Sequence, residues 1–301
     1  MRRLGLAIAF FTFAFGTFLL WRAVAPLSPD AALAAGLGQL LHAENISGVV
    51  SVVTSADAAA KTPPMTVRGV GRVAIPKDGA VRGDARLATV EADGNAGLAA
   101  DVRVFAGKAA YLQVAVPSAD GAASSVPKGL PEGWLRFSAD VKTDAAAASD
   151  ALRSLRDAAF DGALFTTDGT VTREKLGTTM AYHHMLGVTP DGAAAFAKLF
   201  TDALRGIPLI AAPRGTEEAP AAARVELWTD QKTGRVLQMQ IRIAASATGP
   251  ARIVLIEAVD TTTAVAVEEP ETSTPATAAL RAALAPSVAV PAAAGATEKR
   301  K

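Results

Sequence analysis

Apolar and polar residues alternate along many short segments between about residue 45 and residue 260. The clearest case is residues 224–244, where two alternating segments flank a loop at Lys232-Thr233-Gly234. Successive side chains of a strand point to opposite faces, so a period of two predicts a hairpin with one apolar and one polar face. The same criteria predict further strands at 46–54, 65–75, 81–92, 98–105, 109–116, 134–138, 164–173, 177–186 and 253–259. We expect one large antiparallel sheet, with 253–259 as an edge or closing strand.

Three segments show helical spacing instead. Ser28-Pro29-Asp30 predicts the start of a helix to about His42, and residues 143–160 predict a second one. In the third, Thr189 can cap the first turn, Pro190 lies within it, and Gly206 follows the last turn. This helix would carry one apolar stripe, formed by Phe196, Leu199, Phe200, Ala203 and Leu204. Helices of this kind would cover one face of the sheet, which defines an α+β fold.

The N-terminus carries a long uncharged segment, Leu4 to Trp21, which reaches about 27 Å as a helix. Arg2 and Arg3 precede it, which favours an orientation with the N-terminus inside the cell. A cleaved signal peptide is the alternative, because Ala23-Val24-Ala25 has the small-x-small pattern, although Pro26 fits a peptidase poorly. We expect residues 1–26 to be an uncleaved signal-anchor, a single transmembrane helix that leaves the rest of the chain on the extracytoplasmic side of the cytoplasmic membrane.

The remaining chain divides into two parts. Residues 27–260 carry the strand and helix patterns and are expected to form one extracytoplasmic domain. From residue 261 to 301, Ala, Thr, Pro and Val dominate, and prolines recur too often for a long helix. This part has too little apolar bulk to offset the entropy lost on ordering, so we expect a disordered tail.

Composition excludes several functions. The chain has 30 Lys and Arg against 29 Asp and Glu, and no stripe of arginine with aromatic residues, so nucleic-acid binding is not expected. Cysteine is absent, which excludes disulfides, thiolate catalysis, zinc–thiolate sites and a lipidated N-terminal cysteine.

Two motifs deserve a chemical test. Gly69-Val70-Gly71-Arg72-Val73-Ala74 matches a dinucleotide-binding fingerprint, but Pro76 and Gly79 end the segment before a helix can follow. We interpret its glycines as part of a bending strand. His183 and His184 are adjacent in a predicted strand and therefore point to opposite faces, which disfavours a shared metal ion. A hydrolase using one of these histidines stays an alternative, but no motif supplies its nucleophile. We expect no catalytic residues, no metal and no cofactor.

Two stretches resemble the bacterial lipoprotein-carrier fold, the group that includes LolA, LolB and the LppX/LprG-like proteins. One runs from Arg173-Glu174-Lys175-Leu176-Gly177 through Tyr182-His183-His184 into the helix that ends near Leu204. The other is Val225-Glu226-Leu227-Trp228-Thr229-Asp230 with its partner strand. A strand, a helix and such a hairpin follow in this order in the LppX-like branch. The resemblance covers about residues 28–260 and implies a half-barrel whose concave apolar face, lidded by helices, holds acyl chains. The segment Leu4 to Trp21 would replace the missing lipidated cysteine as the tether.

These observations favour a membrane-tethered, non-catalytic protein of the cell envelope that binds lipid or an acylated ligand. The residues expected to line or close its cavity are Phe196, Leu199, Phe200, Val225, Leu227, Leu237, Met239, Ile241 and Ile243. The alternative is an interaction or sensor module that uses the same sheet, has a filled core and binds an envelope protein; the sequence does not identify such a partner.

Overall fold

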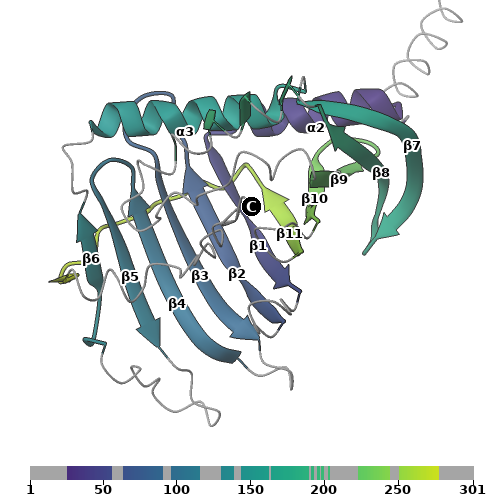
Figure 1. Ribbon diagram of the computed structural model, residues 1–301. Coiled ribbons are helices and arrows are strands. Elements are labelled where there is room, and N and C mark those ends of the chain that lie inside the picture. Colours follow the sequence, from purple (N-terminus) through teal and green to yellow (C-terminus); the bar gives the residue numbers. More distant parts are fainter. Residues whose placement is uncertain are drawn as a thin grey trace, which may run out of the picture.

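A computed structural model describes residues 26–55, 64–90, 96–115, 130–138, 144–162, 164–189, 191–192, 195–196, 198–199, 203, 223–244 and 251–277. Two helices, α2 (Pro29–His42) and α3 (Ala145–Phe160), accompany one sheet (Figure 1). The strands are β1 (Asn45–Thr54), β2 (Met65–Ala74), β3 (Arg82–Val90), β4 (Ala96–Phe105), β5 (Ala109–Ala115), β6 (Leu135–Ser138), β7 (Phe165–Leu176), β8 (Thr179–Val188), β9 (Ala223–Asp230), β10 (Val236–Ile243), β11 (Arg252–Asp260) and β12 (Thr274–Pro275). The predicted α+β class is confirmed.

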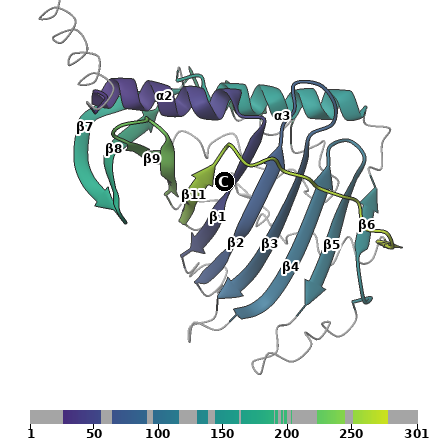
Figure 2. The ribbon, with the colours of Figure 1, turned by 180° about the vertical axis from the view of Figure 1, so that it is seen from behind.

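The sheet has twelve strands in the order β12-β6-β5-β4-β3-β2-β1-β11-β10-β9-β8-β7. All neighbours pair antiparallel except β12 with β6. The expected edge position of the strand at 253–259 is wrong, because β11 pairs with β1 on one side and with β10 on the other. It joins two runs of consecutive strands, and the sequence pattern of a strand does not reveal its neighbours. The sheet is open and strongly curved, as a half-barrel requires (Figures 1 and 2).

Register divides the sheet into two faces with different chemistry. On β1 and β2 the pairs Ile46–Val73, Gly48–Gly71 and Val52–Val67 share one side, which we call the inner face. The opposite side, the outer face, carries ion pairs between neighbouring strands, such as Arg72–Asp84 and Arg86–Asp101. The period of two seen in the sequence therefore separates an apolar face from a mixed face, on which ion pairs lie beside exposed Val53 and Val70.

Helix α2 packs against the inner face where β8, β9, β10 and β11 curve. Ser28 caps it through a hydrogen bond from the Ala31 amide to Ser28 Oγ (3.2 Å), and Pro29 occupies the first turn, as expected. Its close approach depends on Gly36, since a Cβ there would lie 2.9 Å from the Gly234 carbonyl oxygen. The main core forms around this contact and contains Leu40, Leu186, Val225, Leu227, Val236 and Val259.

Helix α3 lies across the ends of strands β2 to β5 (Figure 1). The side chain of Asp144 caps it by accepting from the Ala146 amide (3.0 Å). Buried Ser149 accepts a hydrogen bond from the Val81 amide (3.1 Å), and Ala148 packs with Ile75 and Val81. The helix thus closes one end of the sheet on the inner side.

Residues 261–277, which we call the strap, run from β11 across the sheet to β6, as Figure 2 shows. Val265 and Val267 pack on Phe105 and Tyr111 of the outer face. Glu269 accepts from Tyr111 Oη (2.9 Å) and pairs with Lys108, and the Lys108 ammonium lowers the pKa of the Glu269 carboxyl. The prediction of a disordered tail is therefore wrong for residues 261–277, because the apolar patch that orders them exists only after β4 and β5 have paired; residues 278–301 lie outside the described part.

The third predicted helix is described only in parts. Residues 191–192, 195–196, 198–199 and 203 are helical, and the Gly192 amide donates to Thr189 Oγ1 (3.1 Å), which confirms the expected cap. Phe200 and the expected end at Gly206 lie outside the described residues. Among the residues that the structure describes, no helix has the length and apolarity needed to cross a membrane, and Leu4 to Trp21 is not among them.

Replacing Leu40 by alanine tests how far the fold depends on α2. Leu40 is only 2% exposed and lies in the main core, so we expect Leu40→Ala to lower the free energy of unfolding by about 2–5 kcal/mol. Leu41→Ala is the matched control, since Leu41 is partly exposed and lies outside that cluster. Denaturant unfolding measures both, and equal losses would contradict the assignment of the core.

Candidate functional site

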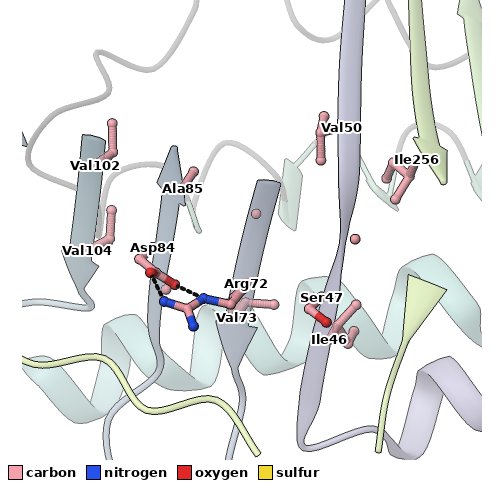
Figure 3. A pocket seen from close by; sticks show the side chains of 13 residues that line it. Ile46, Ser47, Val50, Arg72, Val73, Asp84, Ala85, Val102, Val104 and Ile256 are labelled. Atoms are coloured by element: carbon pink, nitrogen blue, oxygen red, sulfur yellow. Dashed lines mark hydrogen bonds and ion pairs between the residues drawn. The ribbon is translucent and has the colours of Figure 1, made fainter. Parts of the chain in front are cut away.

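An open cavity of about 350 Å³ lies against the sheet where β1, β2, β3, β4 and β11 run side by side (Figure 3). Its inner-face lining is apolar or glycine: Ile46, Gly48, Val50, Gly71, Val73, Gly83, Ala85, Val102, Val104 and Ile256. The apolar members are all partly exposed, so this part of the inner face is only partly covered by the rest of the described chain. Its volume is within the range of small-molecule sites.

Missing side chains on the floor of the cavity keep it hollow. Gly48 and Gly71 lie directly opposite each other on β1 and β2, and Gly83 follows on β3 beside Val73. A Cβ at Gly71 would meet only Val50 Cγ2, at the ordinary contact distance of 3.7 Å. The backbone therefore does not require glycine at position 71, and a larger side chain there would project into the space. The fingerprint-like glycines lie within β2, as expected for a strand.

The apolar surface continues beyond the cavity toward the sheet end opposite α3. Val52, Val67 and Leu87 extend the inner face along β1, β2 and β3, and Val254 extends it along β11. All four are partly exposed. The hollow and this extension together form a continuous apolar wall, on which hydrocarbon can replace water.

On the outer face, the same strands carry pairs of oppositely charged side chains. Arg72 and Asp84 also border the cavity, and Arg72 Nε donates to Asp84 Oδ1 (3.0 Å); one strand further, Arg86 Nε donates to Asp101 Oδ1 (2.7 Å). Figure 3 shows the Arg72–Asp84 pair among the cavity residues. Because successive side chains alternate, these charges point away from Val73 and Ala85. The cavity is thus an apolar pocket, and the reverse side of β2, β3 and β4 carries ion pairs.

The residues predicted to line a cavity lie mostly in the neighbouring half of the sheet. Val225 (7% exposed) and Leu227 (1% exposed) are buried in the main core under α2, with Met239 and Ile241 packed against it. Ile243 is partly exposed at the end of β10, and Phe196 and Leu199 are partly exposed on the helical segment after Thr189. None of these described residues lines the cavity.

Leu237 lies at an irregularity in the β9–β10 pairing. Val236 pairs with Thr229 and Gln238 with Trp228, so the register shifts at position 237. As a result Val236, 1% exposed, occupies the core position that the alternating pattern assigns to Leu237. A bulge shifts the face of every residue on one side of it, which a strict period of two does not allow for.

The two histidines lie on opposite faces, as expected. The ring of His184 is buried on the inner face, where Nε2 lies 3.0 Å from Thr229 Oγ1. His183 stacks on Trp228 on the outer face, with ring centroids 4.2 Å apart, and its Nε2 lies 3.2 Å from Glu226 Oε2. The carboxylates of Glu226 and Glu174 near His183 were not expected from their spacing; strand pairing brings them there. The described residues contain no cluster of three or more acidic, histidine or cysteine side chains suited to a metal ion.

The architecture defines the chain as an open antiparallel half-barrel with helices on its inner face. Among solved structures it is similar to LprF from Mycobacterium bovis, with a TM-score of 0.42 and 11% identity over 80% of this chain and 97% of that one. It is also similar to a domain from Vibrio parahaemolyticus described as an outer-membrane lipoprotein-sorting protein, with a TM-score of 0.24 and 8% identity over 79% and 92%. Rv2717c from M. tuberculosis matches with a TM-score of 0.21 and 9% identity over 77% and 98%.

No protein-family model matches the sequence, and no curated protein sequence matches it either.

Acidification tests the environment of His184. Burial lowers the pKa of its imidazole below the ordinary 6.5, and the charge on His183 lowers it further, while Asp30 opposes this. The unfolded chain therefore binds the proton first, and the contribution of neutral His184 to stability is lost as the pH falls from 6.5 toward the lower folded pKa.

We expect the melting temperature to fall between pH 7.5 and pH 5.5, and to fall less steeply in His184→Gln. His42→Gln, at the exposed last turn of α2, is the control and should keep the wild-type slope. Identical slopes in wild type and His184→Gln would contradict this account.

Proposed function

We propose that this protein is a membrane-tethered, extracytoplasmic carrier that binds lipid or an acylated ligand in the inner-face cavity, without catalysis. One observation carries the proposal: an apolar, partly exposed hollow of about 350 Å³ on the face that a filled-core protein would cover. Each methylene that leaves water for such a surface contributes about 0.8 kcal/mol. An acyl chain is the ligand class that gains most from a wall with no polar side chain on its inner side.

The tether belongs to the proposal because Leu4 to Trp21 has the length and composition of a membrane span and is preceded by Arg2 and Arg3. The domain would then remain close to the bilayer that supplies its ligand.

Position-specific photo-cross-linking in living bacteria distinguishes a lipid from a protein partner. Leu87 lies on the inner face beside the cavity, whereas its neighbour Ala88 points to the outer face. With p-benzoylphenylalanine in place of Leu87 in the full-length chain, we expect mass spectrometry to find adducts of lipid mass. The same substitution at Ala88 is the matched control and should give few of them.

An adduct of one protein in stoichiometric amount at position 87, without lipid, would instead favour the interaction module. Lipid adducts of equal yield at both positions would show only contact with a membrane and would contradict a site on the inner face.

Filling the hollow at Gly71 tests the cavity itself. We expect Gly71→Val in the full-length chain to displace about two methylenes of ligand, and hence to weaken lipid retention by roughly tenfold. Valine suits a strand better than glycine, and the site has room for a Cβ, so the melting temperature should stay level or rise. Native mass spectrometry after extraction in a neutral detergent measures the retained lipid.

Ser51→Val, which adds the same side chain to the outer face of β1, is the control for Gly71→Val. Unchanged lipid retention in a folded Gly71→Val protein, or no retained lipid in the wild type, would contradict the proposed function.

A further inference from the structure

Charged side chains are nearly absent from the inner face around the cavity. The one exception in the described strands, Arg252, points to the kind of ligand that would bind there. In the described residues of β1, β2, β3, β4, β10 and β11, every inner-face position is apolar, glycine, serine or threonine except Arg252. Arg252 begins β11 and is exposed. A cation at the end of an otherwise apolar wall marks the place where an amphiphilic ligand would change from hydrocarbon to headgroup.

The register of β11 fixes the side on which Arg252 lies. Ile256 lines the cavity, and Val254 and Arg252 follow it at intervals of two residues without a bulge between them. Arg252 is paired with Thr54 at the end of β1, away from the start of that strand next to α2. It therefore lies on the same face as the cavity, about 13 Å from Ile256 along the strand, and partly exposed Val254 bridges the interval.

Arg252 also differs from several arginines on the outer face. Arg72, Arg86 and Arg242 each pair with an acidic residue of a neighbouring strand, and Arg68 pairs with Glu257 across β1. No ion pair joins Arg252 to any residue in the described part of the chain. Its guanidinium can bind a phosphate or carboxylate through two parallel hydrogen bonds, which a lysine ammonium does less specifically.

We propose that Arg252 binds the headgroup of the ligand, and that the ligand class is an anionic amphiphile whose acyl chain lies along Val254 toward the cavity. This inference rests on the proposed function, because the acyl chain must first occupy the inner face. It adds selectivity: a zwitterionic lipid with the same chains gains the apolar contacts but lacks the net charge that favours a site at Arg252.

The lipid retained by the full-length chain can test this selectivity. The chain is expressed in a bacterium whose membrane contains phosphatidylglycerol and phosphatidylethanolamine, and it is extracted in a neutral detergent. Lipid that is lost in Gly71→Val is counted as cavity-bound, which excludes lipid held by the N-terminal segment. We expect phosphatidylglycerol to be enriched in this fraction about threefold to fivefold over the membrane, the upper part of the range for an exposed ion pair.

Three variants identify the residue responsible. Arg252→Gln should abolish the enrichment while most of the total cavity-bound lipid remains, and Arg252→Lys should keep part of it. Arg224→Gln is the matched control, because Arg224 is an exposed arginine near the same end of the sheet but on the outer face. It should keep the wild-type ratio.

The possible outcomes distinguish the role of Arg252 from the proposed carrier function. Cavity-bound lipid with the composition of the membrane, or an enrichment that survives Arg252→Gln, overturns the role of Arg252 and leaves the carrier function standing. The absence of any lipid sensitive to Gly71→Val overturns both.

Discussion

A sheet of twelve strands with one apolar face presents more surface than a few helices can cover, and the remaining features of the molecule depend on this mismatch. Helix α2 fills the curve of β8 to β11 so completely that Leu227 is 1% exposed. Helix α3 reaches only the ends of β2 to β5. The inner face along the rest of β1 to β4 therefore stays partly exposed. Leaving apolar surface in water is unfavourable, and contiguous exposed apolar patches in proteins commonly mark places where a ligand or a partner binds.

The hollow and the core follow from the same alternation but differ in side-chain size. Where β9 and β10 present valine, leucine and isoleucine, the inner face is filled against α2. Where β1 and β2 bring Gly48 and Gly71 opposite each other, the same face lacks side chains and a cavity remains. On the reverse side of β2, β3 and β4, ion pairs such as Arg86–Asp101 keep the outer face in contact with water. Shape and polarity are the reasons for which we propose the inner face of β1 to β4 as the binding surface.

Local sequence patterns predicted the strands and helices of this fold. The neighbours of each strand, and hence the position of the cavity, depend on pairing between distant segments. The strands, the caps at Ser28 and Thr189, and the opposite faces of His183 and His184 follow from neighbouring residues and were predictable. The cavity requires knowing that Gly48 faces Gly71 and that β11 lies beside β1, which are contacts between distant segments. The bulge at Leu237 and the ordered strap have the same origin, since each depends on a surface that another strand supplies.

The central place of β11 has a consequence for synthesis of the chain. The partner of β1 on this side is made about two hundred residues after it, so the β1 edge emerges long before its neighbour exists. An unpaired strand with Val49, Val50, Val52 and Val53 is a template for pairing with another chain. Once β11 arrives, it connects both halves of the sheet, and the strap immediately behind it fastens the outer face to β6. The last segment that the structure describes is thus the one that completes the sheet, and a chaperone that shields β1 in the interval would protect the nascent protein from aggregation.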